Sequence, residues 1–215
     1  MRHIYYAIVF SSVLCVSAFG AGQQYRFSTL GGGPPLGPVP AVSVSVGGTV
    51  GVAADAQGNF YFSSFFNCVF KVDSAGTLTM IAGSGIPGPI GSALSAQLNL
   101  PAGLAVDNEG NIYVAEFFGG SVKKISAQGT IATVAGGGSD GDGSPATEAF
   151  LSSPQTVALD RSGNLYIGER NALRKVSPNG IITTVLPGVS PAGLAVSMPP
   201  GPCTSPTSRP PASSS

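Results

Sequence analysis

The octapeptide Asp55-Ala56-Gln57-Gly58-Asn59-Phe60-Tyr61-Phe62 decides the fold, because its pattern recurs twice more along the chain. The second copy is DNEGNIYV at residues 107–114, and the third is DRSGNLYI at residues 160–167. Each copy joins a polar turn, closed by a glycine, to a strand whose side chains alternate between two faces. Three copies at a period of about 50 residues predict an array of small β-units that bury their faces against one another.

The composition favours strands over helices. Only 9% of the 215 residues are charged, whereas 31 glycines and 18 prolines supply turns. No window shows a sustained apolar stripe with helical spacing, so we expect an all-β chain.

Each unit is predicted to be a four-stranded antiparallel meander. In the second copy the strands fall at residues 103–106, 111–116, 121–126 and 130–134, with tight turns between them. Four strands at this period predict a partial β-propeller of three to four blades. The expected blades cover residues 51–99, 100–150 and 151–188, and residues 189–196 open a further one.

These residues resemble NHL repeats. The resemblance is carried by LPAGLAVD at residues 100–107, GNIYVAE at 110–116, LRKV at 173–176 and the glycine-rich loop 135–147, and it spans residues 24–196. The glycine-rich loop resembles that of bacterial secreted NHL proteins. This resemblance implies a ring of blades, usually six, that serves mainly as a binding scaffold. This chain would then form about half a ring. Where such repeats often carry aspartate after the tyrosine strand, this chain has Ser64, Glu116 and Glu169.

The N-terminus predicts export. A basic start precedes an apolar run at residues 4–16, which is the layout of a signal peptide over residues 1–20. The alternative is a membrane anchor, but the run is shorter than the ~20 residues of a spanning helix. We therefore expect a secreted or periplasmic protein without stable membrane insertion. We expect no disulfide between Cys68 and Cys203, because Cys203 lies in an irregular tail.

The two ends of the array differ from its middle. Residues 24–50 are predicted to hold a leading strand, at 25–33, followed by a loop. Residues 197–215 form a Pro/Ser-rich tail whose composition predicts disorder. We interpret this tail as a frameshifted translation of the next blade. When the reading frame is shifted by one base, the codons of Met198 and Cys203 are compatible with the sequence of the missing repeat. A truncated array would expose two radial blade faces and favour self-association.

Several function classes are disfavoured. The single histidine is His3, within the predicted signal, so histidine catalysis and histidine zinc sites are excluded from the mature chain. Lys plus Arg and Asp plus Glu are balanced at 10 each, which gives no electrostatic footprint for nucleic acid. We expect no cofactor.

The acidic residues have competing interpretations. Asp55, Asp107 and Asp160, each with its turn glycine (Gly58, Gly110 and Gly163), are expected to cap turns. Glu116 and Glu169 end their strands, either as solvated ends or as part of a binding rim. Asp140 and Asp142 are weak calcium candidates, since the later bidentate acid of a calcium loop is missing, and the alternative is a flexible loop.

Aromatic and basic pairs also recur. Phe65-Phe66 and Phe117-Phe118 occupy corresponding turns and predict either a partner-binding rim or, the interpretation we favour, packing on the adjacent blade. Alternation sends one residue of each of the pairs Lys123-Lys124 and Arg174-Lys175 outward, onto a solvated face and not a nucleic-acid patch.

Together these features predict a non-catalytic exported scaffold, with an unidentified protein or small ligand as its partner. One alternative is the remnant of a lyase-type or gluconolactonase-type propeller enzyme whose metal site lies in missing blades. Another is a structural surface module that assembles with itself.

Overall fold

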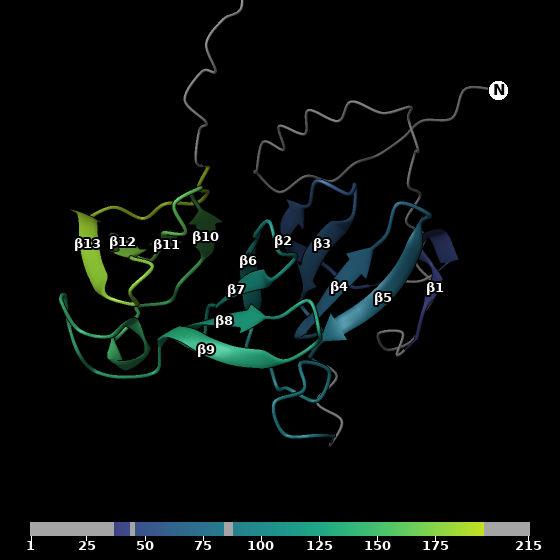
Figure 1. Ribbon diagram of the computed structural model, residues 1–215, viewed down its shortest axis with the longest axis horizontal. Helices are drawn as coiled ribbons and strands as arrows, with labels where there is room; N and C mark the ends of the chain where they lie inside the picture. The colour runs from purple at the N-terminus through teal and green to yellow at the C-terminus, as the bar shows by residue number, and fades with distance from the viewer. Residues whose placement is uncertain (1–36, 44–45, 84–87, 196–215) are drawn as a thin grey trace, which may run out of the picture.

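The computed structural model describes residues 37–43, 46–83 and 88–195 (Figure 1). The predicted signal peptide (1–20), the predicted leading strand (25–33) and the tail (197–215) lie outside the described residues.

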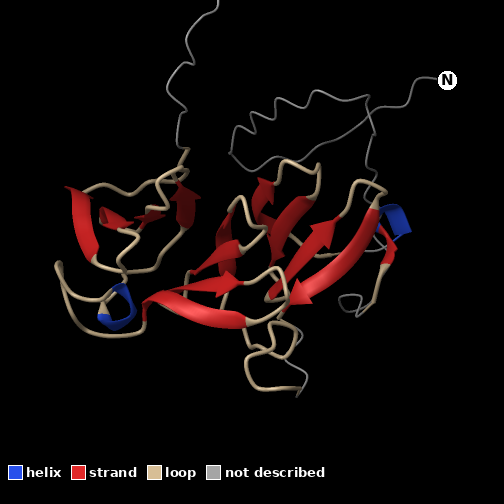
Figure 2. Cartoon of the chain, in the orientation of Figure 1, coloured by secondary structure: helices blue, strands red, loops and turns tan. Residues whose placement is uncertain are grey.

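Three antiparallel sheets, hereafter blades 1, 2 and 3, follow one another along the chain (Figures 1 and 2). Within each blade the four strands pair in sequence order. The predicted all-β, partial-propeller fold class is therefore confirmed. Blade 1 comprises β2 (Thr49–Ala54), β3 (Phe60–Ser64), β4 (Cys68–Val72) and β5 (Thr77–Ala82); blade 2 comprises β6 (Pro101–Val106), β7 (Ile112–Glu116), β8 (Ser121–Ile125) and β9 (Ile131–Gly136); blade 3 comprises β10 (Thr156–Leu159), β11 (Leu165–Gly168), β12 (Ala172–Val176) and β13 (Ile182–Pro187).

The helical content of the described residues is two short 3-10 helices, η1 (Ala41–Ser43) and η2 (Ala146–Glu148). Within that part of the chain, no helix has the length and apolar character needed to cross a membrane.

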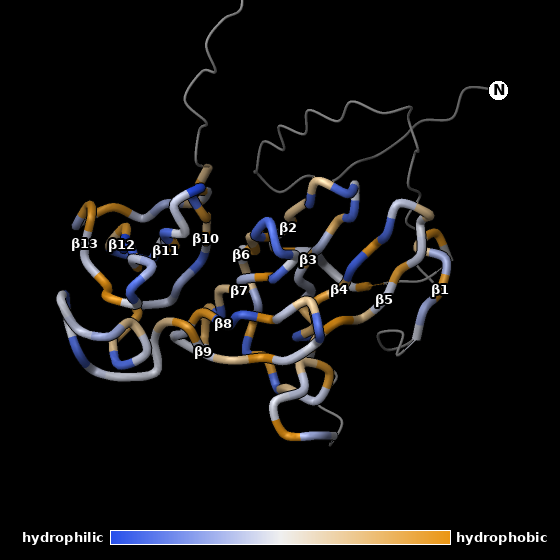
Figure 3. Tube along the Cα trace, viewed as in Figure 1, coloured by the Kyte–Doolittle hydropathy of each residue, from blue (hydrophilic) through white to orange (hydrophobic). Residues whose placement is uncertain are grey.

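The first strand of each blade lies on the inside of the array. β2 packs beside β6, and β6 packs beside β10, whereas β9 and β13 form the outer edges of blades 2 and 3, and β1 lies outside β5 in blade 1. Apolar and hydrophilic residues are interleaved along the strands (Figure 3), as expected for sheets with two distinct faces. This arrangement places equivalent residues of successive blades around a common inner edge.

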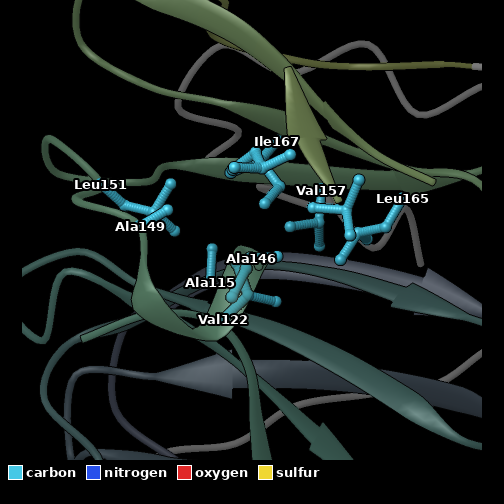
Figure 4. Packing of buried hydrophobic residues seen from close by; sticks show 11 residues of the cluster. Ala115, Val122, Ala146, Ala149, Leu151, Val157, Leu165 and Ile167 are labelled. Atoms are coloured by element: carbon cyan, nitrogen blue, oxygen red, sulfur yellow. The ribbon is translucent and has the colours of Figure 1, made fainter. Parts of the chain in front are cut away.

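The hydrophobic core is divided among the contacts between blades. Between blades 1 and 2, Tyr61 and Val69 pack with Leu104, Ile112 and Ile125. A second cluster joins blades 2 and 3 and includes the 3-10 segment before blade 3 (Figure 4). Its buried members are Ala115, Val122, Ala135, Ala146, Ala149, Leu151, Val157, Leu165, Ile167, Val176 and Ile182.

The inner strands approach each other at glycines. A Cβ added to Gly103 would lie 2.6 Å from Thr156 Cα, and a Cβ on Gly51 would overlap the carbonyl of Ala102. The Gly103 N–H donates to Gln155 O at 2.8 Å across the junction of blades 2 and 3. The missing side chain is what allows the two backbones to approach this closely.

The outer radial face of blade 1 is covered, which corrects two predictions. β1 (Val39–Pro40) pairs with β5, although residues 34–48 were expected to be a loop. The following residues Ala41 and Val46 are buried against Phe62 and Phe70, whose rings stack at 5.3 Å. This face was predicted to be exposed. The sequence did not reveal the cover, because β1 contributes only two residues to the sheet.

The far face of blade 3 is more open. Leu173 stands where blades 1 and 2 have the fully buried Val69 and Val122, yet it is half-buried. Val185, on the outer strand, is 43% exposed.

We predict that Gly103→Ala lowers stability, because the new methyl would collide with the backbone of β10. Overpacking of this kind lowers the free energy of unfolding by about 1–3 kcal/mol. For a chain of this size, each kcal/mol lowers Tm by about 2–4 °C. Thermal unfolding followed by circular dichroism measures the shift. Gly141→Ala is the control, since its Cβ would meet nothing within 4 Å; equal Tm values for the two variants would contradict the packing argument.

Candidate functional site

The repeated aspartates cap the turns from which each blade is built. Asp55 Oδ1 accepts the N–H groups of Gln57 and Asn59 at 3.0 and 2.9 Å, and Oδ2 accepts Asn59 Nδ2 at 2.7 Å and Tyr61 Oη at 3.0 Å. Asp107 and Asp160 accept the corresponding backbone and asparagine donors in their blades. The turn glycines Gly58, Gly110 and Gly163 have φ of +82°, +81° and +79°, which a side chain would oppose.

These hydrogen bonds alter the ionisation of the cluster. Burial opposes the charge on Asp55, but the donors from Asn59, Tyr61 and Gln57 outweigh it and hold its pKa below the ordinary value of 3.8. The hydrogen bond from Asn164 is the largest influence on Asp160 and likewise lowers its pKa. Burial and the neighbouring Asp55 raise the pKa of Tyr61 to about 12.

A lysine completes the cluster in every blade. Lys71 lies 5.8 Å from the ring centroid of Tyr61, and Lys124 and Lys175 take the same position over Tyr113 and Tyr166 at 5.4 and 5.9 Å. The prediction of a solvated basic face missed these cross-strand contacts. The cluster is structural, because its polar groups form their contacts with one another inside a single sheet.

The acids that end the second strands are buried, which corrects the prediction of solvated or rim-exposed carboxylates. Glu116 and Glu169 are each 3% exposed. Glu116 Oε1 accepts the N–H of Asn99 at 2.9 Å, and Glu169 Oε2 accepts that of Ser152 at 2.8 Å. In both blades the carboxylate therefore holds the segment that enters the blade.

Each buried acid has a basic partner on the third strand. Lys123 Nζ lies 3.6 Å from Glu116 Oε2, and Arg174 Nη1 lies 3.4 Å from Glu169 Oε1. Burial raises the pKa of Glu169 despite the Ser152 N–H and Arg174. The sequence contains a signal for this pairing. Blades 2 and 3 have an acid and a base at these two positions, whereas blade 1 has neither and carries Ser64 and Phe70 instead.

Asp142, the weak calcium candidate, is engaged by protein groups. Its Oδ1 lies 2.7 Å from Arg174 Nη2, and its Oδ2 accepts the N–H of Thr184 at 2.9 Å. Asp140 contributes backbone bonds to Glu148 and Phe150. Within the described ranges, no group of three or more His, Cys, Asp or Glu side chains could hold a metal ion. Cys68 is a free, buried thiol whose pKa is raised by burial.

The phenylalanine pairs expose aromatic rings at the corresponding turns of blades 1 and 2. Phe65 is 61% exposed and Phe118 is 69% exposed, Phe66 is also exposed, and Phe117 is half-buried. We call these four residues the phenylalanine face. The favoured prediction, packing on the adjacent blade, is wrong for the three exposed rings. The Phe65 ring lies against the backbone of Gly48, where a Cβ would collide with it.

A hollow opens beside this face, at the inner edge of the array. Its volume is about 270 Å³. Strand register makes Val50 in β2 and Ala102 in β6 equivalent, and Gln155, which immediately precedes β10, takes the same place in blade 3. They line the hollow together with Leu100, Phe117 and Ala192. Leu100 has a φ of +52°, an unusual conformation for a residue with a side chain. We call this feature the axial hollow.

A sequence model of the Teneurin NHL domain matches residues 137–208. Teneurin-3 of Danio rerio is 48% identical over 46 residues, which are 21% of this chain and 2% of the teneurin. The repeats of this chain are thus similar to NHL repeats. The chain aligns with only a small part of the teneurin length, so this similarity describes the repeats and not a whole teneurin.

Solved structures support the propeller fold of these repeats. The structure of the nidogen/laminin complex aligns with a TM-score of 0.52 and 16% identity, covering 69% of this chain and 52% of the other. A Bacteroides thetaiotaomicron protein of unknown function aligns with a TM-score of 0.51 and 22% identity, covering 66% and 37%. Both similarities concern the fold.

The lowered pKa values of Asp55 and Asp160 predict a specific acid sensitivity. Their contribution to stability is complete above the unfolded pKa of 3.8 and is lost as the pH falls through the lower folded values. Below about pH 4, Tm should therefore fall more steeply in the wild type than in Asp55→Asn/Asp160→Asn. Scanning calorimetry from pH 7 to pH 2 measures the slopes. Parallel slopes would contradict this account, and Asp140→Asn controls for the loss of a loop carboxylate.

Proposed function

We propose that this NHL-repeat chain is an exported, non-catalytic binding scaffold that contacts its partner through the phenylalanine face and the axial hollow. The observation that carries the proposal is the exposure of Phe65, Phe66 and Phe118 beside an apolar hollow. Large aromatic side chains are costly to leave in water and are enriched where proteins meet their partners.

The chemistry of the surface indicates an apolar partner. Val50, Leu100, Ala102, Phe117 and Ala192 give the hollow apolar walls, and Gln155 is the polar side chain among its lining residues. A volume of about 270 Å³ lies just below the range for small-molecule sites, about 300–1,000 Å³. It suits one apolar side chain of a polypeptide, with the exposed rings providing further contact around it.

The reactive groups of the described residues support binding rather than catalysis. Glu116 and Glu169 accept backbone hydrogen bonds and pair with basic side chains. The Cys68 thiol is buried, and its raised pKa disfavours the nucleophilic thiolate. The carboxylates of Asp55, Asp107 and Asp160 cap turns, and that of Asp142 binds Arg174 and Thr184. These groups have structural partners, whereas the phenylalanine face has a chemistry suited to contact.

Panning a phage-displayed peptide library against the full chain tests the proposal. We expect enrichment of peptides with apolar or aromatic anchors, and at least a tenfold loss of their affinity for Phe65→Ser/Phe118→Ser. The reason is that burial of each ring removes apolar surface from water. Fluorescence anisotropy with the enriched peptides measures the change.

Ile90→Ser is the matched control. Ile90 is fully exposed, and its neighbour Gly91 accepts the N–H of Ile131 at the start of β9, at the opposite end of the blade from the Phe117-Phe118 turn. The control should bind the peptides as the wild type does. Equal binding by the double phenylalanine variant, or no enrichment at all, would contradict the proposed contact surface.

A further inference from the structure

The loops that precede blades 2 and 3 dock in the same register. The Ile131 N–H donates to Gly91 O at 2.9 Å, and the Ile182 N–H donates to Ser144 O at 3.1 Å. Two residues later in each loop, Ala93 N–H donates to Gly129 O and Ala146 N–H donates to Gly180 O. The shared pairing aligns the loops residue by residue, so that Pro89 stands where the other loop has Asp142.

In blade 3 this loop position supplies a carboxylate to the outer strands. Asp142 pairs with Arg174 at 2.7 Å and accepts hydrogen bonds from the Thr184 N–H at 2.9 Å and the Thr184 hydroxyl at 3.1 Å. A cation, a backbone amide and a hydroxyl thus converge on one carboxylate. Charge-assisted hydrogen bonds of this kind are stronger than neutral ones.

In blade 2 the receiving groups are present, but the loop carboxylate is not. Strand register makes Lys123 equivalent to Arg174 and Thr133 equivalent to Thr184. Proline at position 89 offers no side-chain oxygen. A pocket of about 160 Å³ lies here, and its walls include Ala96, Leu98, Lys123, Ile131 and Thr133.

The Lys123 ammonium is oriented within this pocket. It donates to Thr133 Oγ1 at 2.7 Å and lies 3.6 Å from Glu116 Oε2, and its side chain is 26% exposed. An ammonium has three donors, and these two contacts use at most two of them. Lys123 has one carboxylate neighbour in these contacts, whereas Arg174 has two, Glu169 and Asp142.

We propose that the pocket beside Lys123 and Thr133 is a carboxylate-binding site, filled by a ligand in the way that Asp142 fills its counterpart in blade 3. Apolar walls from Ala96, Leu98 and Ile131 accept a short aliphatic stem. A volume of about 160 Å³ is below the range of about 300–1,000 Å³ of most small-molecule sites. The ligand is therefore a short acid, either free in solution or as an acidic side chain of a polypeptide. This site is separate from the phenylalanine face and does not depend on its function.

Amide NMR titration of the full chain tests the site with two probes. Sodium acetate, at an ionic strength matched with sodium chloride, represents a free acid. The peptide SDGDGSPA, which copies residues 139–146, represents an acidic side chain on a polypeptide. We expect saturable shifts of the Thr133 and Lys123 amides with at least one probe. Binding of acetate alone identifies a free acid as the ligand, and binding of the peptide alone identifies a polypeptide.

Variants separate the site from nonspecific charge effects. Lys123→Gln should weaken binding at least tenfold, Lys123→Arg should retain it, and Lys124→Gln, whose lysine lies over Tyr113, should leave it unchanged. With both peptides amidated at the C-terminus, replacing both aspartates by asparagine should abolish binding. Absence of shifts with both probes, or equal binding by Lys123→Gln and the wild type, would overturn the proposal.

Blade 3 provides a second measurement that does not require a variant of Lys123. Asp142→Ala empties the position between Arg174 and Thr184, so acetate should bind there and raise Tm more than it does in the wild type. An equal effect of acetate on the two proteins would contradict carboxylate recognition by this pair of residues.

Discussion

The close backbone contact between neighbouring first strands is the constraint on which the rest of the structure depends. Gly103 lies against Thr156, and Gly51 lies against Ala102, at distances that leave no room for a side chain. These contacts bring the blades close enough for Val69 and Val122, on their third strands, to be completely buried. Apolar side chains that a single thin sheet would expose thereby become a core shared by two blades.

A second set of contacts holds the connecting segments on this framework. In blades 2 and 3 a buried glutamate binds the incoming backbone and pairs with a basic residue of the third strand. Blade 1 achieves the same attachment without charge, since the Ser64 hydroxyl donates to Val46 O and Phe70 packs in the core. The fold therefore tolerates different chemistry at one position, and these differences between repeats are where specific binding properties can arise. The Lys123 pocket is one such difference.

The sequence predicted the blades well because their signals are local. The Asp-x-x-Gly-Asn turn and the alternation after it depend on neighbouring residues, and Asp55, Asp107 and Asp160 lie in such turns. The burial of Glu116 could not be read in this way, because alternation assigns a side chain to a face and does not say what covers that face. The pairing of Asp142 with Arg174 joins residues 32 positions apart through a loop without regular structure. Exposure of Phe65 and Phe118 likewise depends on how the blades are arranged.

The central claim is that the blades stabilise one another and open together. Amide hydrogen exchange under native conditions tests it most directly, by comparing Gly103 N–H, which donates to Gln155 across the junction of blades 2 and 3, with the amides of β7 inside blade 2. The account predicts that both open with the same free energy, because loss of the junction exposes the shared core. A Gly103 amide that exchanges through a much less costly opening, while the β7 amides stay protected, would show that the blades are independent and would contradict the account.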